Sequence, residues 1–545
     1  MPASLVDSVH KKTIDIAFRE TVDKFPQNSF IVVPSSIGRG YHDNGFEISY
    51  SEAFTKVDAL KNRFTDAGYS AGHRIAIALD NRPEHILYKL ALNSLGISCV
   101  PINPDYRASE LSYILEHSEA VLIIYLRKQE ETIAQAQVLM NKYINTWCFD
   151  VAEEELPLIR REKIIDLVNY ETESSLLYTS GTTGFPKGCR LSNQYELMSG
   201  AWYAGLDGMS SMYLGQERVF NPLPLYHVNA GVVSLLGMML LGGCQIQPDR
   251  FHPRTFWDDV ISTKATIIHY LGVVVPMLLN QPEAGNEQAH SIRFGLGAGV
   301  EAGLHQVFED RFGFPLIEIW GMTEMVRLLA ANKHPRKRGT RAIGKPVPGL
   351  EVEIRDGQDK KVPNGITGEM VVRYSEKTPR LGFFLGYLKD DDATQWAWRN
   401  GWFHTGDSVY QDPDGMLHFV DRMKNIIRRS GENIAAAEVE GVLQECEQVE
   451  QVAVISVPDP VREEEVLACI VTVEGILPNK ELAKTLFEYC NQKLSYFKTP
   501  GWIKFEEDLP KTGSQKIQKH LIFAKDVDPL KVEGMIDFRS LKRRS

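Results

Sequence analysis

A loop rich in glycine and hydroxyl groups is the part of the chain best suited to bind an anion. It follows a short apolar run and contains Thr179, Ser180, Gly181, Thr182, Thr183, Gly184 and Lys187. Backbone N–H groups and hydroxyls of such a loop can surround a phosphate, and the lysine adds positive charge. It is not a Walker A loop, because Gly188 follows the lysine where Ser or Thr would bind magnesium. Alone, the pattern leaves phosphate binding and an ordinary turn equally open.

A second segment has side chains suited to a nucleotide. It contains Trp320, Gly321, Met322, Thr323 and Glu324. Trp320 can stack on adenine, and Thr323 can donate to a phosphate or to an acyl carboxylate. Glu324 can hold Mg²⁺, which prefers carboxylate and phosphate oxygens. The alternative is the end of a strand with a buried tryptophan.

Three further candidates lie elsewhere in the chain. The small residues Gly297, Ala298 and Gly299 let the backbone approach a flat ring closely. A Rossmann fingerprint is disfavoured there, because no ribose-binding acid is evident at the expected distance. His227 lies in a proline-containing loop, where the alternative is an ordinary core histidine. Lys516 lies in a basic segment, where the alternative is a solvated run of charges.

In their order along the chain, these segments resemble the motifs of the adenylate-forming superfamily, which contains acyl-CoA synthetases, peptide-synthetase adenylation domains and luciferases. The resemblance covers nearly the whole chain. It implies that the loop at 179–187 closes over the β- and γ-phosphates of ATP. It also implies that the backbone at 297–299 packs against adenine and forms the floor of the acyl pocket. It also implies that Asp407 accepts hydrogen bonds from the ribose hydroxyls. Lys516 is then the catalytic lysine, which bridges the acyl carboxylate and the α-phosphate.

The resemblance implies further roles around a mobile C-terminal domain. His227 would line the acyl pocket and change position between the two half-reactions, and Arg422 would contact ribose or phosphate. Arg428 stands for a more usual lysine, and Ser430 with Gly431 would face the channel for pantetheine.

Three further departures from the family pattern bear on the predicted site. Asn193 replaces a usual histidine, Trp320 a usual tyrosine, and Gln515 a usual glycine. Asn193 puts a pocket role for that side chain in doubt, and Gln515 could slow closure of the loop before Lys516.

The expected function is an ATP-dependent carboxylic acid–CoA ligase that uses ATP, Mg²⁺ and coenzyme A. A stand-alone adenylating enzyme serving a carrier protein and a non-catalytic nucleotide-binding relative stay open. The stretches around residues 324–331, 462–466 and 496–500 look most like crotonobetaine/carnitine–CoA ligases. Binding of a cationic acyl group requires acidic side chains or a cage of aromatic side chains, and neither can be identified in the sequence. Arg327 could meet a second carboxylate on the substrate, or it could be an ordinary surface arginine.

The elements that must position these residues alternate between strands and helices, which predicts βαβ units and parallel sheet. The expected fold is α/β, with a large N-terminal AMP-binding domain at 1–421 made of βαβ subdomains plus a β-barrel-like subdomain. A small mobile α+β domain at 422–545 follows, with a hinge near 421–425. Strands are expected at 452–457, 467–473 and 502–505, with helices at 436–444 and 479–493 between them.

The composition of the chain limits the kinds of partner and the cellular compartment that we expect for the protein. The 545 residues carry a net charge of −11, which disfavours nucleic acid as a general partner. The seven cysteines show no metal-ligand spacing and are expected to be buried thiols in a reducing compartment. The start lacks the apolar core of a signal peptide, and the apolar run at 231–244 predicts a buried helix rather than a membrane span. We therefore expect a cytoplasmic protein without integral membrane association, and a homodimer is one assembly it could form.

Overall fold

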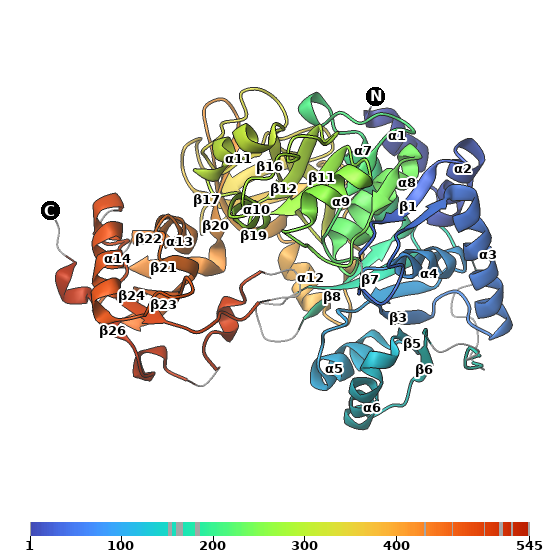
Figure 1. Ribbon diagram of the computed structural model, residues 1–545, viewed down its shortest axis with the longest axis horizontal. Coiled ribbons are helices and arrows are strands. Elements are labelled where there is room, and N and C mark those ends of the chain that lie inside the picture. Colours follow the sequence, from blue (N-terminus) through green and yellow to red (C-terminus); the bar gives the residue numbers. More distant parts are fainter. Residues whose placement is uncertain are drawn as a thin grey trace. The chain divides into compact units, whose positions relative to one another are not determined.

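The structure is a computed structural model that describes residues 2–36, 38–150, 155–159, 167–179, 186–429, 432–459, 461–494, 496–511, 516–524 and 527–542. The chain divides into two compact units (Figure 1). The first contains Met1–Glu351 and Arg373–Trp402, and the second contains Val352–Val372 and Phe403–Ser545. The predicted boundary at 421/422 does not coincide with this division by packing, and as a statement about the hinge it stays a prediction.

The first unit contains a seven-stranded sheet of predominantly parallel strands in the order β18-β8-β7-β4-β3-β5-β6. Its strands are β3 (Arg74–Ala78), β4 (Ser98–Pro101), β5 (Leu122–Tyr125), β6 (Asn145–Cys148), β7 (Glu173–Thr179), β8 (Lys187–Ser192) and β18 (Gly386–Tyr387). The connecting helices are α3 (Tyr50–Asp66), α4 (Pro83–Ser94), α5 (Ala108–Ser118) and α6 (Glu130–Leu139). The predicted βαβ alternation is confirmed.

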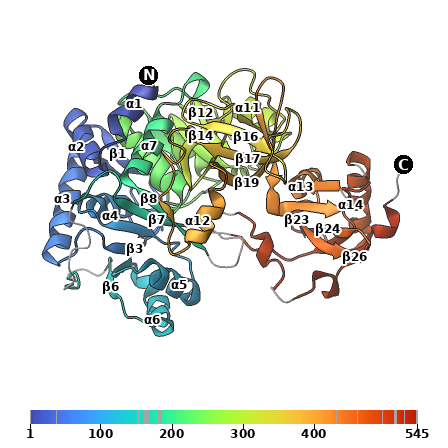
Figure 2. The same cartoon turned by 180° about the vertical axis from the view of Figure 1, so that it is seen from behind.

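Burial on both faces explains why this sheet reads as nearly continuous apolar runs. Ile75 and Ile77 of β3 pack with residues of α3 and α4, whereas Ala76 and Ala78 pack with residues of α5 and α6. Successive side chains of a strand point to opposite faces, so α3 and α4 cover one face and α5 and α6 the other (Figures 1 and 2).

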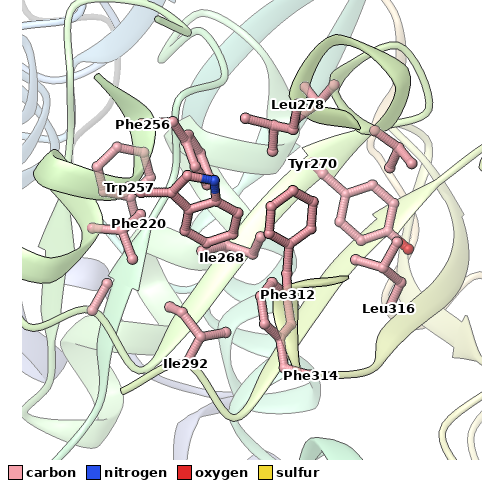
Figure 3. Packing of buried hydrophobic residues seen from close by; sticks show 14 of the residues in the cluster. Phe220, Phe256, Trp257, Ile268, Tyr270, Leu278, Ile292, Phe312, Phe314 and Leu316 are labelled. Carbon is pink, nitrogen blue, oxygen red and sulfur yellow. The ribbon is translucent and has the colours of Figure 1, made fainter. Parts of the chain in front are cut away.

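An eight-stranded sheet forms the other half of the first unit, in the order β14-β13-β12-β11-β9-β10-β1-β2. Its strands are β1 (Ser29–Val33), β2 (Phe46–Ser49), β9 (Arg218–Phe220), β10 (Cys244–Ile246), β11 (Ile267–Leu271), β12 (Phe294–Ala298), β13 (Leu316–Met322) and β14 (Met325–Ala330). Helices α9 (Phe256–Ser262), α10 (Val274–Leu279) and α11 (Leu304–Phe312) supply one apolar cluster with this sheet, around Trp257, Phe312 and Phe314 (Figure 3).

The remaining helices of the first unit are α1 (Pro2–Val9), α2 (Ile14–Lys24), α7 (Asn193–Ala204), α8 (Leu235–Leu241) and α12 (Asp391–Ala397), and β15 (Ala342–Gly344) is a short strand. The predicted buried helix at 231–244 is confirmed in type, although it begins as a π-helix at Asn229–Ser234 and ends at Leu241. α7 and α8 cross so closely that a Cβ on Gly200 would lie 2.6 Å from the backbone of Leu236. Only glycine fits there.

The second unit begins with an antiparallel sheet of β16 (Glu351–Arg355), β17 (Gly368–Arg373), β19 (Phe403–Gln411) and β20 (Leu417–Arg422), of which β17 pairs with β19 and β19 with β20. The described strands form an open sheet and not a closed barrel, which corrects the expected barrel-like subdomain. Closing a barrel requires hydrogen bonds between the first and last strands of the sheet, and β16, which lies at one end of the strand order, does not pair with the strand at the other end.

The C-terminal part is an α+β layer, as predicted. Its strands are β21 (Ile426–Arg429), β22 (Glu432–Ala435), β23 (Val449–Asp459), β24 (Glu463–Thr472), β25 (Trp502–Phe505) and β26 (Ile536–Asp537). Helices α13 (Ala436–Gln444) and α14 (Lys480–Lys493) pack on this sheet. The predicted strands and helices all form here, with β23 and β24 longer than expected.

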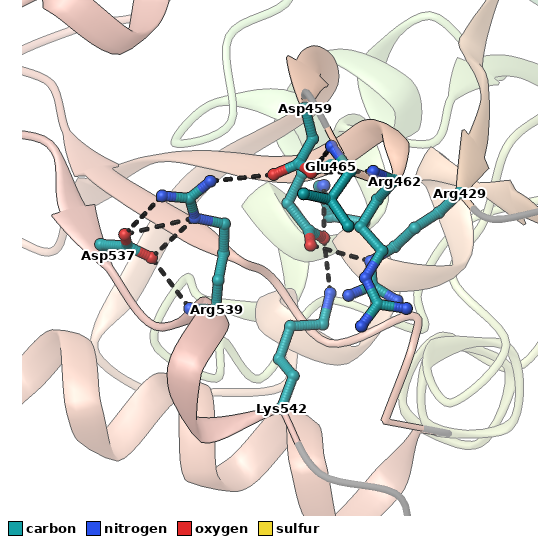
Figure 4. A network of polar contacts seen from close by, with 9 residues as sticks. Arg429, Asp459, Arg462, Glu465, Asp537, Arg539 and Lys542 are labelled. Carbon is teal, nitrogen blue, oxygen red and sulfur yellow. Dashed lines mark hydrogen bonds and ion pairs between the residues drawn. The ribbon is translucent and has the colours of Figure 1, made fainter.

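A buried ionic network ties the end of the chain to this layer (Figure 4). Glu465 accepts from Arg429 at 2.8 Å and from Lys542 at 2.6 Å, and all three side chains are almost fully buried. Burial lowers the pKa of the Lys542 ammonium to about 8. Arg539 adds ion pairs to Asp459 and Asp537 at 2.8 Å.

Candidate functional site

Thr323 and Glu324 form the two-residue turn between β13 and β14, closed by the pairing of Met322 with Met325. The phenol of Tyr195 on α7 donates to the carbonyl of Thr323 at 2.7 Å. Trp320 is buried and pairs across the strands with Leu329. The sequence-predicted residues 320–324 therefore lie on one hairpin fixed by a neighbouring helix.

The carboxylate of Glu324 is linked to Lys187, at the end of the predicted phosphate loop, through a tyrosine to which the sequence analysis assigned no role. Tyr387 donates from its phenol to Glu324 Oε1 at 2.8 Å. The ammonium of Lys187 lies 5.0 Å from the centre of the Tyr387 ring and 3.6 Å from a carboxylate oxygen of Asp390. Burial and the nearby charge of Glu324 raise the pKa of Tyr387, so the tyrosine stays a hydrogen-bond donor.

The phosphate loop itself connects β7 to β8. The two strands are antiparallel, and Thr179 lies opposite Lys187 at their shared end. Both residues are half-buried. The predicted loop residues Ser180, Gly181, Thr182, Thr183 and Gly184 lie outside the described residues, so their roles stay predictions.

The glycine run at 297–299 forms the end of β12 and the turn after it. A Cβ on Gly297 would lie 2.3 Å from the carbonyl oxygen of Tyr270, and Gly299 has a φ of +85°. Ala298 and Gly299 are exposed. The run therefore presents exposed backbone, as a surface for a flat ring requires.

Glu318 holds this turn, and sequence reasoning missed it. Its carboxylate accepts from the backbone N–H of Gly299 at 2.9 Å and of Val300 at 3.3 Å, and from the phenol of Tyr270 at 3.1 Å. Glu318 lies two residues before Trp320 on β13. The same strand therefore carries the Trp320 ring and the carboxylate that holds the turn at 298–300. A buried acid so close to a predicted site is the signal that could have revealed it.

His227 lies at the end of a rigid loop. Asn81 accepts from the N–H of Leu225 at 2.8 Å and donates to the carbonyl of Leu223 at 3.1 Å. The His227 N–H bonds the carbonyl of Pro224 at 3.0 Å, and the ring is half-buried beside Tyr226. These hydrogen bonds hold the proline-containing loop in place, and the pocket role of His227 stays a prediction.

Asn193, which replaces a family histidine, is a structural residue. It is buried, accepts from the N–H of Ile14 at 2.9 Å and donates to the carbonyl of Thr172 at 3.0 Å. It therefore joins α2 and the start of β7 to α7.

The second unit carries the predicted ribose-binding residues as a pair. Asp407 on β19 lies opposite Arg422 on β20, and Arg422 Nε is 2.8 Å from Asp407 Oδ1. Asp407 is almost fully buried, whereas the Arg422 side chain is 39% exposed. An arginine with that exposure can reach a ligand while it fixes the carboxylate.

Lys516 is exposed in the second unit, beside the bridge between Lys511 and Ile517. Arg428 lies in β21 opposite Asn433. The side chain of Arg428, and Ser430 and Gly431 altogether, lie outside the described residues, so their roles stay predictions.

Three further observations concern the cysteines, groups of side chains that could hold a metal ion, and helices that could cross a membrane. Six of the seven cysteines are buried, and Cys446 is half-buried. In the described part of the chain, no group of three His, Cys, Asp or Glu side chains is arranged to hold a metal ion. No helix among these residues has the length and apolar character needed to cross a membrane.

Comparison with known families identifies two domains. The family of AMP-binding enzymes matches residues 18–388, and the AMP-binding enzyme C-terminal domain matches residues 438–516. The adenylate-forming resemblance expected from the motifs is confirmed.

Individual relatives agree with the family match. The chain is 30% identical over 495 residues to a crotonobetaine/carnitine–CoA ligase of Proteus mirabilis, covering 87% of this chain and 93% of the relative. A crotonobetaine/carnitine–CoA ligase of Citrobacter koseri is 28% identical, with coverage of 87% and 92%.

Solved structures share the fold at lower identity. ATP-bound MatB from Rhodopseudomonas palustris superposes with a TM-score of 0.77 at 23% identity, covering 93% of this chain and 98% of MatB. The anthranilate CoA ligase AuaEII with anthranoyl-AMP superposes with a TM-score of 0.80 at 20% identity, covering 94% and 96%.

Proposed function

The chain belongs to the family of AMP-binding enzymes, and we propose that it is an ATP-dependent ligase of carboxylic acids and coenzyme A. It forms an acyl adenylate with release of pyrophosphate, and then an acyl-CoA with release of AMP. The observation that carries this proposal is the link from Glu324 through Tyr387 to Lys187. That link brings a carboxylate suited to the magnesium of MgATP close to a cation suited to its phosphates.

The first half-reaction makes a poor electrophile reactive. An oxygen of the acid attacks the α-phosphorus of ATP, the bond from that phosphorus to the bridging oxygen breaks, and pyrophosphate leaves. Positioning and neutralisation of negative charge carry most of the catalysis in such transfers. We assign charge neutralisation to Lys187 and Lys516, positioning of the α-phosphate or acyl carboxylate to Thr323, and support of adenine to the 297–299 turn and Trp320.

Glu324 fits the role of magnesium ligand because Mg²⁺ usually takes only one or two carboxylates and completes its shell with water and substrate phosphates. The Tyr387 hydrogen bond occupies Oε1 and fixes the orientation of the carboxylate. Asp407, fixed by Arg422, is assigned to the ribose hydroxyls.

In the second half-reaction the coenzyme A thiol attacks the acyl carbon, and the bond to the phosphate oxygen of AMP breaks. The thiol proton leaves and AMP departs as the anion. We propose that the C-terminal domain moves between the two steps, so that one acyl site serves both, and that His227 changes position with it. A cytoplasmic location belongs to the same proposal, and homodimer formation stays open.

The first experiment is AMP release from ATP and Mg²⁺ against a panel of carboxylic acids, each with and without coenzyme A. AMP release that requires both an acid and coenzyme A is the expected result. Pyrophosphate exchange with no stimulation by coenzyme A would instead indicate an adenylating enzyme that serves a carrier. Absence of AMP release with every acid would contradict the proposed activity.

Lys516→Ala separates the two half-reactions. We expect it to abolish adenylate formation and to spare thioester formation from supplied acyl adenylate. Lys511→Ala is the matched control, because Lys511 lies in the same segment and pairs with Asp508 at 3.2 Å. Equal loss of both half-reactions in Lys516→Ala would contradict the assigned role.

A further inference from the structure

Arg327 on β14 has a guanidinium that forms no ion pair with any of the residues that the structure describes. Its carbon Cζ lies 3.9 Å from the centre of the Trp202 ring, and the Nε atom is buried without a hydrogen-bond partner. Asp207, the acid whose charge acts on Arg327, is itself paired with Lys333 at 2.7 Å. The side chain is half-buried and so keeps part of its surface exposed.

Desolvation of this group is considerable. Burial lowers the pKa of Arg327 to about 10, and Asp207 and Tyr374 are the facing groups that oppose this effect. An arginine remains charged at neutral pH even so, and a partly desolvated guanidinium gains more from an anion than a solvated one does.

The distance from the reacting end follows from α7. Tyr195 and Trp202 are seven residues apart and therefore lie on one face of the helix, on the order of 10 Å apart along its axis. Tyr195 bonds the carbonyl of Thr323, and Trp202 stacks on Arg327. The four residues from Thr323 to Arg327 can span at most about 14 Å, so this separation lies within the reach of the hairpin.

We propose that Arg327, stacked on Trp202, binds a second anionic group of the acid substrate on the order of 10 Å from the reacting carboxylate. This inference rests on the proposed ligase activity, because it takes the reacting carboxylate to lie at Thr323. A planar guanidinium fixed against a ring presents its N–H groups in a fork that matches a carboxylate.

The same arrangement disfavours an acid with a cationic far end, such as carnitine or crotonobetaine. A quaternary ammonium group binds over aromatic faces or beside acids. Here Arg327 covers the face of Trp202, and Asp207 is paired with Lys333. The preferred acid therefore differs in charge from the substrates named for the 28–30% identical relatives.

The test compares diacids with monoacids of equal length in the coenzyme A-dependent AMP assay. The pairs are succinate and butyrate, adipate and hexanoate, and suberate and octanoate, with carnitine added. We expect at least one diacid to exceed its monoacid tenfold in kcat/KM, and we expect Arg327→Met to remove that preference without lowering turnover of the monoacid. Arg327→Lys should retain part of the preference for the diacid, because lysine keeps the positive charge but lacks the paired N–H donors of the guanidinium.

Arg250→Met is the matched control, because Arg250 is 78% exposed in the same unit and lies 3.8 Å from Asp249. Preference for the monoacids or for carnitine would overturn the inference and leave the ligase activity intact. Equal loss for diacid and monoacid in both Arg327 variants would also overturn it. No AMP release with any acid would refute the ligase activity, and the inference with it. Calorimetric titration of the full chain with the preferred diacid, weakened at least tenfold in Arg327→Met, gives a readout besides turnover.

Discussion

The carboxylate of Glu318 accepts a hydrogen bond of 2.9 Å from the backbone N–H of Gly299. The second carboxylate oxygen takes the N–H of Val300 and the phenol of Tyr270. Three donors from β11 and the turn after β12 thus converge on one acid of β13. Because Gly299 belongs to the turn assigned to adenine, the position of that surface depends on Glu318.

We expect Glu318→Ala to raise the KM for ATP about tenfold or more while kcat changes less. Hydrogen bonds to a charged group contribute roughly 1.5–3 kcal/mol, and their loss frees the turn without removing a reacting group. Glu318→Gln should have a KM for ATP between that of the unchanged protein and that of Glu318→Ala, because its amide keeps one acceptor oxygen. Steady-state kinetics in ATP check this, with Glu20→Gln as the surface control. An unchanged KM in Glu318→Ala would contradict the role.

The glycines of this turn are required for different reasons. A Cβ at Gly297 would clash with the Tyr270 carbonyl at 2.3 Å, whereas a Cβ at Gly299 meets nothing closer than 4.0 Å but requires a φ of +85°. We expect Gly297→Ala to cost about 3 kcal/mol or more in unfolding free energy, and Gly299→Ala about 1–2 kcal/mol.

Gly303→Ala is the control for both, because its Cβ would lie in open space and its φ is −71°. Denaturant unfolding of the three variants measures the ranking. Equal losses at 297 and 299 would show that crowding by Tyr270 is relieved by movement of the turn.

Sequence reasoning singled out the segment 320–324, Asp407, Arg422 and most elements, because each is encoded in a short contiguous segment. The structure added that the segment is a hairpin and that Asp407 pairs with Arg422. Sequence reasoning missed Tyr387, Glu318 and Tyr195, whose roles arise from contacts with residues far away in the chain. Tyr387 meets Glu324 across 63 positions of sequence, and Tyr195 meets Thr323 across 128. Only the folded structure shows which tyrosine reaches which acid or carbonyl.

The correction to the fold and the contacts found for Asn193 have the same origin. The barrel-like subdomain was an expectation from resemblance, and strand alternation alone does not determine whether the first and last strands of a sheet pair. Asn193 was interpreted as a lost histidine, whereas its amide joins Ile14 and Thr172 from two other elements. A substitution seen only in sequence shows what is lost and not which contacts replace it.

Lys89 and Glu196 form a buried ion pair in which Nζ lies 3.0 Å from Oε1 and the side chains are 3% and 0% exposed. Removing one partner leaves a buried charge uncompensated, so we expect Lys89→Met to cost about 3–5 kcal/mol. The double variant Lys89→Met with Glu196→Leu should recover most of that loss. Equilibrium unfolding in urea measures both. A double variant as unstable as the single one would mean that Ser174 and Ser175, which also bond the pair, dominate.

Two buried histidines predict loss of stability in acid. Burial lowers the pKa of His85 to about 3, with the charge of Lys89 adding to the effect, and burial alone lowers the pKa of His269 to about 3. Their ordinary value is 6.5. Below that pH the unfolded chain binds protons that the folded chain does not, so the stabilising contribution is complete above 6.5 and falls as the pH decreases towards 3.

Each histidine should therefore remove about 1.4 kcal/mol of unfolding free energy per pH unit across that interval. His269→Gln, which loses bonds to Tyr203 and Asn229, should be less stable at pH 7 but should have a shallower pH dependence. His520→Gln is the control, because His520 is exposed. Unfolding curves at several pH values between 4 and 7 decide the point, since an unchanged slope in His269→Gln would mean that His269 already binds a proton in the folded protein.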